Sequence, residues 1–222
     1  MSIMKKFKFL SYFLDQNTPI YAGNKMNRIE QLSSIENGDS ANSKSIFINN
    51  HSGTHIDFPK HFCVDGKTSS NYSASFWHFY NTYVLCIDAN NDELINLNES
   101  QLSKIPRDID FLILNTGFHR LRSERTYWEN NPGIHPKLAS VLRSRFKKIK
   151  AIGMDLISLT SFQNREIGRK AHKEFLCKND ILIIEDMDLN GIEKIKINKI
   201  ICAPLLVSEI DGSPVTIIAE YS

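Results

Sequence analysis

Three histidines and one aspartate fall within a single eleven-residue window that runs from His51 to His61. They follow the pattern H-x3-H-x-D-x3-H, with His55 and Asp57 between the two ends. The chain has 7 histidines in 222 residues, so an even distribution would place fewer than one in such a window. Imidazole nitrogens beside a carboxylate oxygen are common ligands of divalent metal ions. The window therefore predicts a metal site.

The backbone of this window is expected to be extended. Gly53, the β-branched Thr54 and Pro59 all disfavour a helix. Side chains alternate along a strand, so the first two histidines and the aspartate would share one face, with Gly53 leaving open space between them. Pro59 would end the strand and let His61 turn back toward the same space. The alternative is a group of ordinary loop histidines.

Two residues from the second half of the chain are candidates for the same site. Glu185 directly follows the apolar run 181–184, and a carboxylate at the end of a buried strand is costly unless it is paired or binds a metal. His172 lies on the helix expected before that strand. Asp186 and Asp188 compete with Glu185 as the acid that faces the site. Alternatively, Glu185 and His172 are both ordinary surface residues.

The composition is that of a folded globular chain, with 41% hydrophobic and 23% charged residues. Its 27 basic and 25 acidic side chains leave a net charge of only +2, which gives no basic surface for nucleic acid. No stretch reaches the ~20 apolar residues of a membrane span. The length predicts one domain, residues 1–222, and the partner expected is a small-molecule substrate.

The cysteines and the N-terminal segment indicate the cellular compartment of the protein. Four cysteines, at positions 63, 86, 177 and 202, form no CxxC pair and lie among apolar residues. We expect buried free thiols in a reducing compartment. Near the N-terminus, Lys8 interrupts an apolar run and Asp15 follows it, without a small-residue cleavage site. Residues 1–14 are therefore interpreted as a first strand of a cytoplasmic protein.

Apolar, β-branched runs alternate with few helical segments. Strands are expected at 45–48, 82–87, 109–114, 149–154, 181–184, 195–207 and 215–219. Apolar residues at helical spacing predict helices at 136–147 and 167–177. The runs 111–114 and 181–184 lack alternation, which is typical of strands covered on both faces. This arrangement predicts a layered α/β or α+β domain.

The window 51–62 matches the pattern H-x-G-T-H-x-D-x-P-x-H-F at every fixed position. Further motif segments are 18–23, 114–118, 152–155, and His172 followed by 181–185. Through these motifs the chain resembles the cyclase family of metal-dependent hydrolases, which includes bacterial kynurenine formamidases and isatin hydrolases. The resemblance extends from about residue 9 to residue 220.

The resemblance implies an α/β fold with a central, mixed, barrel-like sheet and a few flanking helices, in a homodimer or homotetramer. It also implies one or two divalent ions per chain, zinc or manganese, and hydrolysis of an amide-type C–N bond by metal-activated water. The implied metal ligands are His51, His55, Asp57, His172 and Glu185. Asp57 and Glu185 would be the residues able to bridge two ions, and His61 would transfer protons.

Other family segments are altered. The early loop has Ala22, Gly23 and Asn24 after Tyr21, where kynurenine formamidases often carry W-P-G-D. The segment 156–160 departs from the common T-P-S-x-D, and Phe118 replaces a tryptophan. The metal site is therefore expected to be intact and the substrate pocket changed.

Three residues are assigned supporting roles. Tyr21 would form an aromatic wall of the pocket, and Thr116 would offer a hydroxyl to substrate. Asp155 would orient a ligand histidine. The sequence leaves two alternatives to a hydrolase: a metal- or ligand-binding protein that has lost turnover, and an enzyme with cyclase or lyase chemistry.

Overall fold

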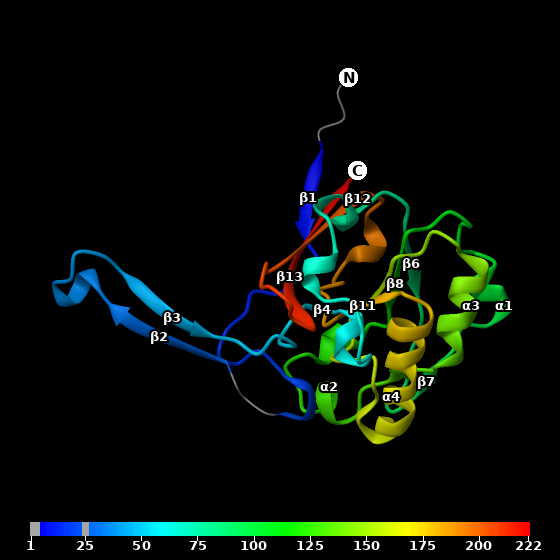
Figure 1. Cartoon of the computed structure of the whole chain (residues 1–222), viewed down its shortest axis with the longest axis horizontal. Coiled ribbons are helices and arrows are strands. Elements are labelled where there is room, and N and C mark those ends of the chain that lie inside the picture. The colour runs from blue at the N-terminus through cyan, green and yellow to red at the C-terminus, as the bar shows by residue number, and fades with distance from the viewer. Residues whose placement is uncertain (1–4, 24–26) are drawn as a thin grey trace.

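The computed structural model describes residues 5–23 and 27–222. A mixed sheet forms its centre, in the order β5-β12-β13-β4-β11-β10-β8-β6, and β1 pairs with β13 (Figure 1). Its strands are β1 (Lys6–Phe9), β4 (His55–Asp57), β5 (His78–Phe79), β6 (Thr82–Cys86), β8 (Phe111–Asn115), β10 (Ala151–Met154), β11 (Leu182–Glu185), β12 (Ile197–Pro204) and β13 (Gly212–Tyr221). The sheet curls into a nearly closed, barrel-like form, which confirms the fold implied by the resemblance.

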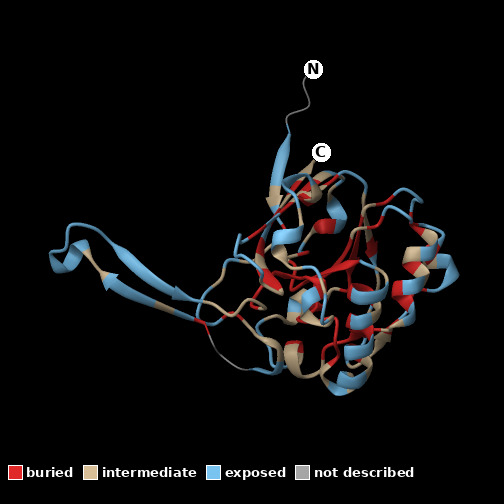
Figure 2. Ribbon diagram, viewed as in Figure 1, coloured by how far each residue is buried: buried red, intermediate tan, exposed pale blue. Residues whose placement is uncertain are grey.

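The sheet has a parallel half and an antiparallel half. Strands β6, β8, β10 and β11 run parallel, and β11 then pairs antiparallel with β4. The apolar runs of β8 and β11 are buried along their whole length, as their lack of alternation predicts. Figure 2 shows these strands as the buried centre of the molecule. Strand β4 therefore lies in the middle of the sheet.

Helices flank the sheet. They are α1 (Glu99–Leu102), α2 (Thr126–Glu129), α3 (Lys137–Arg145) and α4 (Arg165–His172), and a π-helical turn, Lys173–Lys178, continues α4. Short 3-10 turns are Tyr21–Gly23, Ile35–Asn37, Pro59–His61, Ser69–Asn71, Ala74–Trp77, Phe118–Leu121, Phe162–Asn164 and Ile192–Lys194. Both predicted helices are present, and α3 buries Leu138, Ala139 and Leu142 as its apolar face requires.

A hairpin of β2 (Arg28–Ser33) and β3 (Ser43–Phe47) extends away from the body as an arm (Figures 1 and 2). A separate short pair joins β7 (Leu94–Ile95) and β9 (Gly133–Ile134). The predicted first strand is present as β1, although residues 1–4 of that prediction lie outside the described residues. Asn24 of the early loop lies outside them too. No helix among the described residues is long and apolar enough to cross a membrane.

The prediction of four buried free thiols is wrong. Cys63 and Cys177 form a disulfide, and Cys177 and the free Cys86 are both exposed. Only Cys202 is a buried free thiol. The pairing joins residues 114 positions apart, so local sequence context carried no signal for it. The disulfide connects the turn after His61 to the end of the helical segment that follows α4.

We expect Cys177→Ser to lower the free energy of unfolding by ~2–4 kcal/mol, because a cross-link over a long loop restricts the unfolded chain. Urea unfolding without reductant measures this loss. Cys86→Ser, which removes an unpaired thiol, is the matched control and should leave the midpoint nearly unchanged. Titration of four free thiols in the unreduced, unfolded protein would show that the bond does not form.

Candidate metal centre

Strand β4 presents His55 and Asp57 on the same face because side chains alternate along a strand. Its neighbour β11 places Glu185 directly opposite His55. All three side chains are almost completely buried. The Nε2 atom of His55 lies 3.3 Å from a carboxylate oxygen of Glu185 and 3.6 Å from one of Asp57. One imidazole and two carboxylates thus converge in the middle of the sheet.

His51 reaches this cluster from a turn, so the prediction of an extended segment from His51 to Asp57 is only partly right. Gly53 has a left-handed φ of 62°, and a Cβ there would lie 2.2 Å from the side chain of Leu14. Gly53 therefore permits a tight turn and does not leave open space between ligands. Gly212 makes room for His51, since a Cβ at that position would lie 2.2 Å from the ring. The His51 Nδ1 atom is 2.8 Å from Asp57 Oδ1.

His172, the last residue of α4, completes the cluster. Its Nε2 atom lies 3.5 Å from Asp57 Oδ2 and 3.4 Å from Glu185 Oε1. Its Nδ1 atom is 2.9 Å from the backbone oxygen of Gly168, and His55 Nδ1 is 2.8 Å from that of Gly53. A ring that donates its Nδ1–H to a carbonyl presents Nε2 as a ligand, so both imidazoles are oriented as in metal sites.

Glu185, and not a neighbouring acid, faces this cluster. Asp186 accepts two hydrogen bonds from Arg122, at 2.8 and 2.7 Å, and one from the hydroxyl of Tyr127 at 2.6 Å. It also has a left-handed φ of 50°, which turns the chain after β11. Asp188 accepts a hydrogen bond from the backbone of Asn190, away from the cluster. The predicted choice of Glu185 therefore agrees with the geometry.

The histidines of the cluster hold its two carboxylates, Asp57 and Glu185, in the ionised form. Burial raises the pKa of Glu185, and the charge of Asp57 raises it further, but hydrogen bonds with His172 and His55 outweigh both and lower it to about 2. Burial likewise raises the pKa of Asp57, yet His172 and His51 hold it well below its usual value. Buried acids this close together require positive charge beside them.

Protonated histidines supply that charge in the metal-free protein. Burial lowers the pKa of His55, but Glu185 and Asp57 raise it to about 9. Burial also lowers the pKa of His172, and the same two carboxylates raise it to about 10. A divalent cation would replace these protons. Two sets of donor atoms, each within 4.8 Å of one another, share Asp57: one adds His51 and His55, the other His172 and Glu185. This donor set fits a divalent metal.

We expect metal binding at pH 7 to release about two protons per chain, because His55 and His172, with pKa values of about 9 and 10, must deprotonate to become ligands. The apparent metal affinity should therefore rise with pH between 6 and 9. Calorimetry in buffers of different ionisation enthalpy counts the protons. Metal binding at pH 7 with no proton release would contradict this charge assignment.

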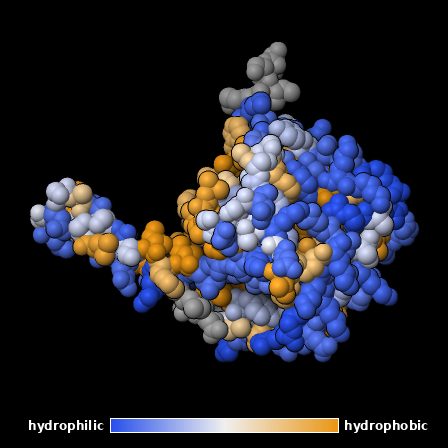
Figure 3. Space-filling model, in the orientation of Figure 1, coloured by the Kyte–Doolittle hydropathy of each residue, from blue (hydrophilic) through white to orange (hydrophobic). Residues whose placement is uncertain are grey.

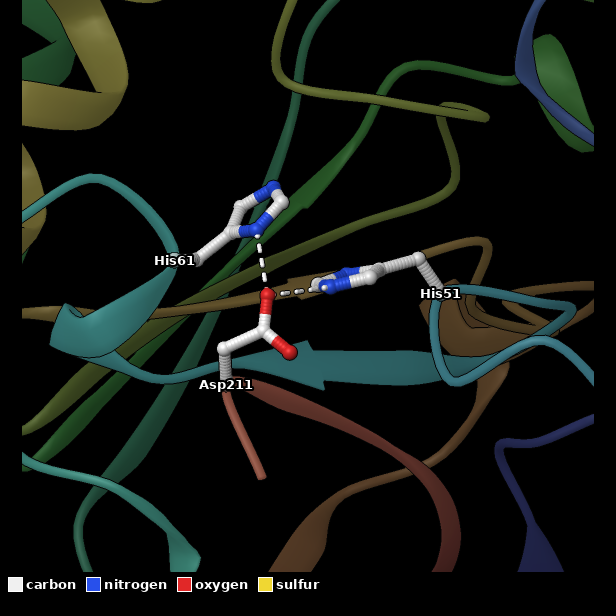
Figure 4. A group of neighbouring side chains, drawn as sticks. All are labelled: His51, His61 and Asp211. Atoms are coloured by element: carbon white, nitrogen blue, oxygen red, sulfur yellow. Dashed lines mark hydrogen bonds and ion pairs between the residues drawn. The ribbon is translucent and has the colours of Figure 1, made fainter. Parts of the chain in front are cut away.

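His61 lies beside the cluster with a partner that sequence reasoning missed, Asp211. One carboxylate oxygen of Asp211 lies 2.9 Å from His61 Nδ1 and 3.2 Å from His51 Nε2 (Figure 4). Burial raises the pKa of Asp211, but these two histidines lower it on balance. Asp211 directly precedes β13 and lies 150 residues from His61, so only its Asp-Gly dipeptide, a common turn signal, marked the position.

A pocket of about 390 Å³ opens over the cluster. Its lining consists of the five candidate ligands, His61 and Tyr21, together with Phe62, Ile157, Ser158, Thr160, Arg165 and Arg169. The last four polar residues were missed. The two arginines lie one and two helical turns before His172, a spacing that the sequence already contained.

Asp155 and Thr116 do not line this pocket. Asp155 accepts hydrogen bonds from the backbone and hydroxyl of Thr116, each 2.8 Å long, and contacts His119 Nδ1 at 2.8 Å. Asp155 therefore orients His119. The prediction that it orients one of the metal-ligand histidines is wrong. The hydroxyl of Thr116 points to Asp155 and not to the substrate space. Both residues follow adjacent parallel strands, β8 and β10, which explains why they meet.

Three comparisons relate the sequence and the fold of this chain to known proteins. The family described as Putative cyclase matches residues 9–160. A kynurenine formamidase of Bacillus cereus is 30% identical over 206 residues, which covers 93% of each chain. Isatin hydrolase A of Labrenzia aggregata superposes with a TM-score of 0.80 at 18% identity, covering 97% of this chain and 93% of the other. A structure described as a potential metal-dependent hydrolase with cyclase activity gives 0.75 at 17% identity and 99% coverage of both.

Proposed function

Because this chain belongs to the cyclase family, we propose that it is a metal-dependent hydrolase that cleaves an amide-type C–N bond. The observation that carries the proposal is the convergence of two carboxylates and three imidazoles at the floor of a pocket, with His61 beside them. A bound divalent ion would polarise the amide carbonyl and make water a competent nucleophile near neutral pH.

The chain's own residues orient and move protons. Asp211 holds His61 through Nδ1, so Nε2 is left to accept a proton from the attacking water and return it to the leaving nitrogen. The carboxylate also stabilises the imidazolium that forms between these two transfers, as in other carboxylate–histidine pairs. A protein that only bound metal would not need this pair, so it favours an enzyme over a silent binding protein.

The substrate class follows from the relatives. Kynurenine formamidases and isatin hydrolases are named for a formamide and for a cyclic amide. We propose an arylformamidase-like activity on a formamide, lactam or cyclic imide, and a role in tryptophan catabolism. The ions proposed are zinc or manganese. The two donor sets that share Asp57 support one or two ions per chain, with Asp57 able to contact both.

A substrate screen tests the proposal. The zinc-loaded and manganese-loaded protein is incubated with aryl formamides, lactams and cyclic imides, and the released acid and amine are measured. Hydrolysis of at least one class by the loaded protein, and not after chelation, supports the proposal. Ring closure or elimination without net hydrolysis would indicate cyclase or lyase chemistry, and binding without turnover would indicate a binding protein.

We also propose a homodimer or homotetramer. The arm of β2 and β3 contacts little of its own body yet exposes apolar side chains: Leu32, Ile35, Ile46 and Phe47 are 67, 58, 62 and 51% exposed. Figure 3 shows apolar surface along the arm and where it meets the body. Exposed apolar patches of this kind are typical of protein interfaces. Light scattering of the purified chain tests the assembly.

The cytoplasm is the location we propose, with no membrane or nucleic-acid partner. The structure joins Cys63 and Cys177 in a disulfide, a bond that persists mainly in oxidising compartments, so the redox state of this pair in cells tests the proposed location. Trapping of thiols in intact cells tests the point: a reduced Cys63 and Cys177 supports the cytoplasm, and an oxidised pair supports export.

A further inference from the structure

The Cys63–Cys177 disulfide joins two segments of the chain that carry residues of the site. Residues 59–66, the Cys63 turn, contain His61 two positions before the cysteine. The π-helical turn Lys173–Lys178, the Cys177 turn, directly follows the candidate ligand His172. Neither cysteine lines the pocket or belongs to a donor set. The bond therefore fastens the proposed proton carrier to the segment of a ligand without itself contacting the site.

The Cys63 turn is compact, so a shift of its cysteine also shifts His61. The backbone N–H of Cys63 donates to the carbonyl of Pro59 over 2.9 Å, and that of Gly66 donates to the carbonyl of Cys63 over 3.0 Å. A Cβ at Gly66 would lie 2.4 Å from the backbone of Pro59, which shows how closely the turn folds on itself. The turn therefore moves as one unit.

The π-helical geometry brings Cys177 round toward the face of His172. On an α-helix, residues five apart point about 140° away from each other, because each residue turns the helix by about 100°. In the i→i+5 pattern of a π-helix they lie about one turn apart, on nearly the same face. The Cys177 turn has this pattern. A cysteine five residues after the ligand is thus placed on the side of the helix from which the ligand reaches the site.

Few other contacts hold the two turns together. The Phe62 ring stacks on the His172 ring, with centroids 4.4 Å apart and planes at 22°. Lys67 pairs with Asp180 at 2.8 Å just outside the two turns, but both side chains are more than half exposed, and such pairs contribute little. In the part of the chain that the structure describes, no hydrogen bond or ion pair joins the turns directly. The disulfide is therefore their main connection.

The disulfide is also accessible to reductants. Cys177 is exposed and Cys63 is half-buried, whereas Cys202 is fully buried. A thiolate of a dithiol reductant attacks the sulfur of Cys177, the S–S bond breaks, and Cys63 leaves as a thiolate that takes up a proton. The second thiol of the reductant then displaces Cys177 from the mixed disulfide. Two electrons pass to the protein, which gains two thiols, and the reductant becomes a disulfide.

We propose that the Cys63–Cys177 disulfide is a reversible clamp that positions the Cys63 turn against His172, so that its reduction weakens metal binding and turnover. The two cysteines are positioning residues, which act through His61 and His172. In a reducing compartment disulfides are usually transient and redox-sensing, so oxidation would close the clamp there. The effect on turnover rests on the proposed hydrolase function, and the effect on metal binding does not.

Metal affinity tests the clamp without any substrate. Manganese is titrated by calorimetry into the oxidised protein and into protein reduced with dithiothreitol, which is removed before the titration. Manganese is the probe because free thiols prefer softer ions such as zinc. We expect about tenfold weaker binding after reduction, the lower end of the loss seen when groups that orient a ligand are removed, and recovery on reoxidation. Equal affinities in the two states would overturn the clamp and leave the hydrolase proposal standing.

Cys63→Ser/Cys177→Ser should bind manganese as weakly as the reduced protein, and dithiothreitol should not change it. Should this variant not fold, Cys63→Ala/Cys177→Val keeps apolar contact between the turns without the bond. Cys86→Ser removes a thiol outside the clamp and is the matched control, which should respond to reduction as wild type does. Sensitivity to dithiothreitol in a protein that lacks both cysteines would place the sensitive group elsewhere and refute the proposal.

Hydrogen exchange separates a local clamp from a general loss of stability. In the reduced, metal-free protein the two turns should exchange their backbone protons within minutes, several-fold faster than in the oxidised protein. The buried strand β8 should stay protected over the same time. Unchanged exchange in both turns, or loss of protection in β8 as well, would contradict a clamp that acts on the site.

Turnover at saturating metal tests the effect on His61, with the substrate that the screen identifies. We expect reduction to lower kcat by about tenfold or more and to change KM less, because a small displacement of a catalytic group slows the reaction more than it weakens binding. Reoxidation should restore kcat in wild type and leave Cys63→Ser/Cys177→Ser slow. Equal kcat in the oxidised and reduced protein would show that the disulfide does not position His61.

Discussion

His61→Ala is expected to keep most of the bound metal and to lose about 10²-fold or more in kcat, the usual loss when an acid–base group is removed. The physical reason is its position. His61 is held by Asp211 at the edge of the cluster, whereas the buried donors belong to other residues. Metal content and turnover are measured on the same preparation, with the substrate that the screen identifies.

His135→Ala is the control for this change. His135 lies beyond the pocket, where its Nδ1 atom accepts a hydrogen bond from the backbone of Lys137. The control should retain both metal and turnover. Full turnover in His61→Ala would mean that the proton carrier lies elsewhere, with Asp57 or Glu185 the next candidates.

His55→Ala is expected to lose the metal as well as the activity. This residue is buried between Asp57 and Glu185, and its removal takes away a nitrogen donor and leaves two buried acids with less positive charge beside them. We expect metal affinity to fall by at least about 10²-fold, since a direct ligand should count for at least as much as the 10–100-fold typical of its hydrogen-bond partners.

Elemental analysis after dialysis checks this result, and circular dichroism shows whether the fold is retained. Should the variant unfold, the milder His55→Gln keeps the volume and removes the ring nitrogen. A His55 variant that stays fully loaded, beside a His61→Ala protein that is empty, would reverse the two assigned roles.

The parts of the site that a short motif encodes were predictable. His55 and Asp57 are two residues apart on one strand and therefore share a face. Glu185 ends a buried strand, where an unpaired carboxylate would be costly, so its position indicated a partner or a metal. The longer strands of the central sheet followed from apolar runs, which are continuous where both faces of a strand are covered. Helices α3 and α4 followed from apolar residues at helical spacing. The strands β2, β5, β7 and β9 and the short helices α1 and α2 were not predicted.

The parts that depend on distant contacts were not predictable. Asp211 and Cys177 each meet partners more than a hundred residues away, and the sequence around a single Asp or Cys does not indicate such a partner. The role of Gly53 was misjudged because its purpose, a left-handed turn against Leu14, depends on packing that the motif does not encode. Asp155 contacts His119 because the parallel strands β8 and β10 end side by side, a pairing that the local sequence of neither residue indicates.

The most direct test of metal-dependent hydrolysis is a metal titration of the chelated protein, with bound metal and amide hydrolysis measured on each sample. Wild type should gain activity in proportion to bound zinc or manganese, with saturation at one or two ions per chain. Asp57→Asn, which removes the carboxylate shared by both donor sets, should gain neither metal nor activity. Hydrolysis that persists at full rate without bound metal, or equally in Asp57→Asn, would contradict the proposed function.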